Sequence, residues 1–442
     1  MLAGSCLPLR GLAETPRLRV GVVSDIHVKR DRSALAWRRA LEFYRDRRVD
    51  AVLVPGDLTT WSTRQEFEDV LRIWREVFPG ERLPDGTPVE RLFVSGNHDL
   101  RGQHAEEVAR WWQELFGEEY VPISVRSVKG YPFVLRHWVE PGQTSPMPAW
   151  FAAHGAELPR DRPFFYVQHE HPAGTCSAPG LPKGDDDEGI ATNVLAAYPN
   201  AIAFSGHSHM SLLEERTIWQ GAFTSVGCGA CCGWAFTWAG RENGHSWDDD
   251  ARPAKEMSPL DFQSCRQGLL MEVFDDRVTL ERRDWEHGLR LGPDWVIPLD
   301  GSRPYRHAPR QAASRPPAFG PGASVSVMAV AAGADRAKDV HPQVAVEFPP
   351  VSGLTGGTRA FDFEVVCEAE TAGAVRTVAA RRVYSPNALQ PAQLDVEPVR
   401  CLFAGRSLPD GERIRFAVRP LDEWGKAGQA IVSKWLTKGG IR

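Results

Sequence analysis

Seven side chains that can bind divalent metal ions follow short apolar runs in the first half of the chain. They are Asp25, His27, Asp57, Asn97, His169, His207 and His209. This mixture of nitrogen and oxygen donors favours ions such as Mn, Fe, Zn, Co or Ni over Ca and Mg, which prefer oxygen ligands alone. Two such ions, with two carboxylates and a bridging hydroxide, would keep about one positive charge to hold an anionic phosphate. The pattern therefore predicts hydrolysis of a phosphate ester by two metals acting together.

The apolar runs before these side chains predict β-strands. Six runs are expected to form strands: 18–24, 51–55, 91–95, 163–168, 201–205 and 222–227. Since open α/β sheets bind ligands beyond the carboxyl ends of their strands, the side chains that follow the strands should meet at one rim. Gly56, Gly96 and Gly206 precede ligand positions and let the backbone turn where a side chain would clash.

Helical patterns alternate with these strands and predict an α/β layered fold for residues 18–300. Ser62 and Gln65 are expected to form a capping box that starts a helix. Apolar residues then recur at helical spacing, and Pro79-Gly80 ends this helix. A shorter pattern after Ser33 predicts a second helix.

The last third of the chain has a different pattern. Residues 301–322 are dense in Pro and Gly, which predicts a linker, and residues 323–442 are predicted to form a β-sandwich. The predicted strands of this sandwich are 324–330, 343–348, 361–367, 379–384, 413–419 and 430–434. The domain has no cluster of His, Asp or Cys, so no chemistry is assigned to it. Cys367 and Cys401 lie on or near its strands and could pair if the chain is exported.

Composition limits the class of partner. The 442 residues carry a formal net charge of −5, which argues against a nucleic acid as the main partner. No apolar stretch reaches the ~18 to 20 residues of a membrane span. Residues 1–17 fit either the remnant of a signal peptide or an irregular cytosolic N-terminus, so export and a cytoplasmic location both stay open. A small phosphate ester is the expected partner, and the oligomeric state is not predicted.

Five motifs resemble the signature of the calcineurin-like metallophosphoesterases over residues 18–285. They are Asp25-Ile26-His27, Gly56-Asp57, Gly96-Asn97-His98-Asp99, His169 and Gly206-His207-Ser208-His209. The resemblance implies a four-layer αββα fold with a bimetal centre. It implies that one metal is held by Asp25, His27 and His209, the other by Asn97, His169 and His207, with Asp57 as the bridge. His98 would then act beside the leaving-group oxygen as general acid or charge stabiliser, oriented by Asp99.

Two motifs are also similar to those of the class III cyclic nucleotide phosphodiesterases, namely Gly56-Asp57-Leu58-Thr59 and Gly96-Asn97-His98-Asp99-Leu100-Arg101. Arg101 could then bind a phosphate oxygen, although a surface ion pair explains it equally well. The fourth motif departs from the family's usual His-x-Pro, because His169-Glu170-His171-Pro172 has one residue more. His169 directly follows a predicted strand and is the expected ligand, with His171 as the alternative.

A further likeness is to bacterial exported members with an appended immunoglobulin- or fibronectin-like domain, in which a loop after the last motif carries Cys-Gly-x-Trp. Cys232-Gly233-Trp234 has the corresponding place in this chain and is expected to wall the pocket. The leading hypothesis is hydrolysis of a phosphomonoester or phosphodiester. An alternative is a catalytically idle metal-binding module whose sandwich binds carbohydrate or protein, but the intact His98-Asp99 pair argues against it. A nuclease of the same fold is disfavoured by the acidic balance.

Overall fold

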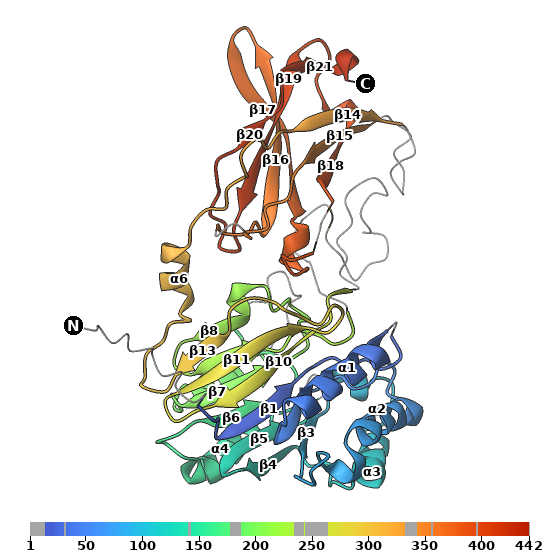
Figure 1. Cartoon of the computed structure of the whole chain (residues 1–442), viewed down its shortest axis with the longest axis vertical. Coiled ribbons are helices and arrows are strands. Elements are labelled where there is room, and N and C mark those ends of the chain that lie inside the picture. The colour runs from blue at the N-terminus through green and yellow to red at the C-terminus, as the bar shows by residue number, and fades with distance from the viewer. Residues whose placement is uncertain are drawn as a thin grey trace, which may run out of the picture.

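The protein is described by a computed structural model, shown in Figure 1. The described residues are 14–30, 32–139, 143–176, 187–233, 243, 264–331, 343–354, 357–394 and 397–441. In Figure 1 the strands from β14 onward form the upper part of the molecule, and the preceding α/β elements form the lower part. No helix in the described ranges is long and apolar enough to cross a membrane.

The first sheet of the α/β domain is mixed. Its strand order is β12-β11-β10-β1-β2-β3, with β13 paired to β11. The strands are β1 (Leu18–Val22), β2 (Ala51–Pro55), β3 (Glu90–Val94), β10 (Gln267–Val273), β11 (Arg277–Asp284), β12 (Leu289–Arg290) and β13 (Trp295–Pro298). Strand β1 runs parallel to β2, and β2 runs parallel to β3. The carboxyl ends of these three strands therefore lie at the same edge.

The second sheet has the order β4-β5-β6-β7-β9-β8. Its strands are β4 (Ile123–Val128), β5 (Tyr131–Arg136), β6 (Phe164–Val167), β7 (Ala201–Ser205), β8 (Ile218–Gln220) and β9 (Thr224–Gly227). Strands β5, β6, β7 and β9 are parallel neighbours, and antiparallel β4 and β8 form the two edges. The strands that precede His169 and His207 thus end side by side.

Side chains point alternately to the two faces of each sheet, and the central strands are buried on both faces. One face of each sheet meets in a shared core, with residues such as Val22 and Leu53 from the first sheet and Phe165 and Phe204 from the second. The outer face of the first sheet packs on α1 (Ser33–Asp46), α2 (Arg64–Val77) and α3 (Ala105–Phe116). The outer face of the second sheet packs on α4 (Met147–His154) and α5 (Ile190–Leu195). The predicted four-layer αββα architecture is confirmed.

The start of α2 corrects the predicted capping box. The box is formed by Thr63 and Glu66, one residue later than expected for both members. Ser62 has a left-handed φ of 54° and uses its hydroxyl to donate to the Asp99 carbonyl oxygen at 2.5 Å. Local sequence favours Ser62 as the cap, but its hydroxyl is engaged in this tertiary hydrogen bond and Thr63 caps the helix instead.

The C-terminal region forms two antiparallel sheets. One has the order β14-β15-β18, and the other has the order β17-β16-β19-β20 with β21 paired to β19. The strands are β14 (Ser326–Val330), β15 (Gln343–Phe348), β16 (Asp362–Thr371), β17 (Ala374–Tyr384), β18 (Val399–Ala404), β19 (Arg413–Leu421), β20 (Ile431–Val432) and β21 (Leu436–Thr437). Both sheets contribute to one apolar core, as the sandwich prediction requires. Cys367 and Cys401 both lie buried in this core, and they do not form the disulfide considered above.

The segment predicted as a linker is partly helical. It contains α6 (His307–Ala313), and the Arg310 guanidinium on this helix contacts Glu215 of the α/β domain. The ring of His307 packs edge-on against Trp424 of the C-terminal region, with centroids 5.3 Å apart. Tertiary contacts on both sides therefore order a stretch whose Pro and Gly content predicts irregular structure.

Candidate metal centre

The predicted ligands lie on the loops that follow β1, β2, β3, β6 and β7, at the edge where these parallel strands end. Five of them have a left-handed backbone with φ between 43° and 63°: Asp25, His27, Asp57, His207 and His209. Each such conformation costs about 1 to 3 kcal/mol for a residue with a side chain, and such strain concentrates at functional sites. The backbone is therefore bent at these positions in a way that local preference does not explain.

Two buried carboxylates form the middle of the cluster. The Asp25 Oδ1 atom lies 2.9 Å from His209 Nε2. The Asp57 Oδ2 atom lies 3.3 Å from His169 Nε2 and 3.4 Å from His27 Nε2. Donor atoms of Asp25, His27, Asp57 and His209 all lie within 4.8 Å of one another. One cation could contact all four.

The remaining predicted ligands extend the cluster on the other side of Asp57. The Asn97 Oδ1 atom is 3.0 Å from His169 Nε2, and the ring centroids of His169 and His207 are 4.9 Å apart. Asn97 and His207 are only partly buried, whereas His169 is fully buried. All seven predicted residues are thus brought together, with Asn97 and His207 at the open side.

Backbone groups orient the ligands. The Pro55 carbonyl oxygen accepts a hydrogen bond of 2.7 Å from His169 Nδ1, so the Nε2 lone pair points into the cluster. The His98 amide donates to Asp57 Oδ1 at 2.8 Å, and the His207 amide donates to Asp25 Oδ2 at 3.1 Å. A side chain at Gly96 would collide with the Asp57 carboxylate, which explains the glycine there.

The electrostatics of the cluster favour positive charge. Burial disfavours the charged form of His169, but the nearby Asp57 carboxylate outweighs this and raises the His169 pKa to about 9. Burial likewise opposes charging of Asp57, yet His169 and His27 hold its pKa well below the usual value. Burial lowers the pKa of His27 well below the usual value. Both of its nitrogens are buried and have no hydrogen-bond partner among the described residues. Unpartnered imidazole nitrogens beside two carboxylates fit a metal site well.

His98 lies next to this cluster, with its ring centroid 4.7 Å from that of His27. Its Nδ1 atom donates to the Thr60 carbonyl oxygen at 2.9 Å, because a carbonyl can only accept. The other ring nitrogen, Nε2, is then the one that can exchange a proton with a bound molecule. Burial lowers the pKa of His98, and the Asp57 carboxylate opposes that shift.

Asp99 does not orient the His98 ring directly, and that part of the prediction is wrong. Its carboxylate accepts hydrogen bonds from the amides of Gly96, Leu58 and Thr59 and from the Thr59 hydroxyl, at 2.8 to 3.2 Å. Burial, with the Asp57 carboxylate, raises the Asp99 pKa to about 7. Asp99 therefore ties the loop after β2 to the loop after β3, and Thr60 orients the ring.

Arg101 places one guanidinium nitrogen 3.5 Å from His98 Nδ1. Its guanidinium carbon lies 4.9 Å from the ring centroid of Trp61. Within the described ranges, no ion pair involves Arg101, so the predicted alternative of a surface ion pair finds no partner there.

His171 lies two residues further along the same loop. Its backbone carbonyl accepts from the Asp187 amide at 3.3 Å, and its side chain is buried. The adjacent Glu170 forms a buried ion pair of 2.7 Å with Arg136 at the end of β5. The residue that departs from the family pattern thus anchors the loop, while His169 faces Asn97 and Asp57.

Two neighbours of the cluster were not predicted as parts of it. The Trp138 ring lies 5.9 Å from both His169 and His207, centroid to centroid. Cys232 Sγ lies 3.6 Å from His209 Nδ1, so this thiol is beside a predicted ligand. Cys232 was expected only to wall the pocket together with Trp234, which lies outside the described residues. No sequence spacing links Trp138 or Cys232 to the motifs, because folding alone brings them there.

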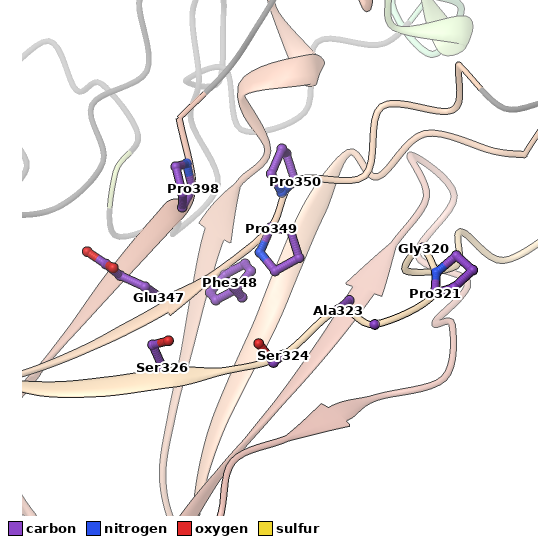
Figure 2. Close-up of a pocket in the computed structure, with 11 residues that line it drawn as sticks. Gly320, Pro321, Ala323, Ser324, Ser326, Glu347, Phe348, Pro349, Pro350 and Pro398 are labelled. Carbon is purple, nitrogen blue, oxygen red and sulfur yellow. The ribbon is translucent and has the colours of Figure 1, made fainter.

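A hollow of about 510 Å³ lies elsewhere, in the C-terminal region. Figure 2 shows it between the segment 320–326 and the end of β15, lined largely by prolines and glycines. Its one charged side chain, Glu347, is paired with Arg400. This hollow has no donor set for a metal, and we assign it no chemistry.

Comparison with known proteins agrees with this geometry. Residues 18–211 match the family model of the calcineurin-like phosphoesterases. The matched residues include β1 to β7 and all seven predicted ligands. No curated protein matches the chain.

Solved structures with some likeness share little sequence with this chain. A dimetal phosphatase from Danio rerio is 13% identical, with 64% of this chain and 100% of that one covered and a TM-score of 0.39. The purple acid phosphatase PPD1 from yellow lupin (Lupinus luteus) is 15% identical, with 64% and 53% covered and a TM-score of 0.38. Vps29 from Entamoeba histolytica, complexed with zinc, is 15% identical, with 64% and 100% covered and a TM-score of 0.30. These TM-scores are too low to carry an argument.

The fourth motif offers a matched pair of variants for metal binding. We expect His169→Gln to lower the divalent metal bound per chain, because the ring nitrogen beside Asn97 and Asp57 is lost. His171→Gln, two residues away and also buried, should bind metal like the parent chain. Elemental analysis after dialysis against Mn²⁺ measures both. Equal metal content in the two variants, or a loss only in His171→Gln, would contradict the assignment.

Proposed function

We propose that this chain is a metal-dependent phosphoesterase that hydrolyses a phosphomonoester or phosphodiester. The observation that supports this most is the convergence of Asp25 and Asp57 with histidines from three separate loops, inside a few ångströms. We assign Asp25, His27 and His209 to one divalent ion, and Asn97, His169 and His207 to a second, with Asp57 shared. When bound, the two ions supply Lewis-acid stabilisation of phosphate oxygens and make a water molecule more acidic.

The chain's own residues bind the phosphate, transfer a proton and position the loops. Asn97 and His207, the less buried members, lie where a phosphate group would enter. Arg101 adds a fixed positive charge next to His98, suited to an oxygen of the phosphate. His98 holds a proton on Nδ1 against the Thr60 carbonyl, and its Nε2 is placed to give a proton to the departing oxygen or to stabilise its charge. Asp99 keeps the two loops that carry Asp57 and His98 in register.

The test of this function is the loss of turnover with Asp57→Asn. We expect kcat on p-nitrophenyl phosphate and bis(p-nitrophenyl) phosphate to fall by orders of magnitude, because the shared carboxylate of both ions is neutralised. Asp284→Asn is the control, since Asp284 is also a buried aspartate of this domain but accepts from the His287 amide instead of contacting a predicted ligand. Both variants should keep the melting temperature of the parent. Parent-like hydrolysis by folded Asp57→Asn would contradict the proposal, and metal binding without turnover of any ester would favour the idle module.

His98 can be tested apart from metal binding. We expect His98→Asn to retain its metal but to lose about 10² to 10⁴ in kcat, since proton transfer to the leaving group typically contributes that much. The loss should be larger for an alkyl ester than for a p-nitrophenyl ester, whose leaving group is stable as an anion. His104→Asn, an exposed histidine at the start of α3, serves as the control. A uniform loss on both esters would assign His98 to charge stabilisation, and unchanged rates on both would remove it from the mechanism.

A further inference from the structure

Trp61 is exposed at the mouth of the candidate metal centre. Its relative exposure is 58%, and among the described residues it is the one aromatic side chain that counts as exposed. An indole carries a large apolar surface that water disfavours, so most tryptophans pack against the protein. An exposed face in this position is available to a bound molecule.

The backbone of Trp61 is tied to the catalytic loop. Its amide donates to Glu66 Oε2 at 3.2 Å, and the preceding amide of Thr60 donates to Glu66 Oε1 at 2.9 Å. The carbonyl of Thr60 is the group that orients His98. The next residue, Ser62, donates to the Asp99 carbonyl. The indole therefore has a defined position relative to the His98 ring.

Arg101 connects the indole to His98. Its guanidinium lies 4.9 Å from the Trp61 centroid and 3.5 Å from His98 Nδ1. The contact with the ring is of the cation–π kind, which holds the indole without a covalent or hydrogen-bonded tether. The order outward from the metal cluster is thus His27, His98, Arg101 and Trp61.

These contacts place Trp61 beside the catalytic histidine. Arg101 approaches His98 from the Nδ1 side, and the indole beyond it lies where it can meet an organic group of a bound ester. Trp138 lies on another side, against His169 and His207. An aromatic face with a guanidinium beside it suits a planar ring better than an aliphatic chain, because stacking adds to the burial of apolar surface.

We propose that Trp61 is a specificity-determining residue that stacks on a planar aromatic group of the substrate. This inference rests on the proposed function, which makes the substrate a phosphate ester. It names the substrate class as phosphate esters that carry an aromatic group.

Two pairs of probes test the inference. Benzylphosphonate and cyclohexylmethylphosphonate have the same carbon skeleton, but only the first has a planar ring, and neither can be hydrolysed at its P–C bond. Benzyl phosphate and cyclohexylmethyl phosphate are the matching esters, and their alcohols leave with similar ease. Calorimetry of the full chain with Mn²⁺ bound gives Kd for the phosphonates, and steady-state kinetics give kcat/KM for the esters.

We expect the parent chain to prefer the benzyl compound by about tenfold in Kd and in kcat/KM, a factor within the range for one aromatic contact. Trp61→Ala and Trp61→Leu should both bring the ratio close to one, since leucine restores apolar volume without a ring. Trp61→Phe should keep part of the preference. Trp435→Ala is the matched control, because Trp435 also lies under arginine guanidiniums but on the C-terminal domain, and its ratio should equal that of the parent.

Equal affinities of the parent chain for the two phosphonates would overturn the inference, as would a preference that survives Trp61→Leu. The outcome is separate from that of the proposed function. If the chain prefers benzylphosphonate through Trp61 but hydrolyses no ester, the stacking role of Trp61 stands and the proposed phosphoesterase activity is wrong. If the chain hydrolyses both esters and the ratio of their kcat/KM values is the same in the Trp61 variants, the phosphoesterase activity stands and the stacking role of Trp61 is wrong.

Discussion

The structure depends on the burial of two carboxylates, Asp25 and Asp57, close enough to share histidine neighbours. Charged groups inside a protein must be compensated, because the loss of water costs several kcal/mol for each ion. Here the compensation comes from His169, whose pKa is raised chiefly by Asp57, from His209, whose pKa is raised by Cys232 and Asp25, and from backbone amides that donate to the carboxylates. The site is therefore built around positive charge.

The strand directions in the two sheets bring the ligand loops together. Parallel β1, β2 and β3 in one sheet and parallel β6 and β7 in the other end at the same side of the molecule, so five loops approach one point. The loops then bend into left-handed conformations at the residues that carry donor atoms. The cores between the sheets and under the helices supply the stability that holds these bends.

Much of this was predictable because it is local. The strands before the motifs have strong apolar runs, and β2 and β7 were predicted to the residue. All seven candidate ligands converge because each directly follows such a strand. Strands β4, β5, β8, β12, β13 and β18 were not predicted, since their pairing depends on tertiary context.

The wrong predictions about individual residues also come from contacts between residues that are distant in the chain. The cap of α2 moved from Ser62 to Thr63 because Ser62 bonds to the loop of Asp99. Asp99 was expected at the His98 ring, but four donors from two loops saturate it. Trp61, Trp138 and Cys232 join the site only through tertiary structure. Spacing in the sequence identifies ligands that follow strands. It does not identify residues that only the tertiary structure brings next to those ligands.

The most direct measurement of the central claim is a crystal structure of the chain grown with Mn²⁺, with anomalous scattering used to locate the metal. The account predicts two anomalous peaks about 3.5 to 4 Å apart, one beside Asp25, His27 and His209, the other beside Asn97, His169 and His207, with Asp57 between them. A map with no peak among these side chains, or with the metal bound only elsewhere on the molecule, would contradict it.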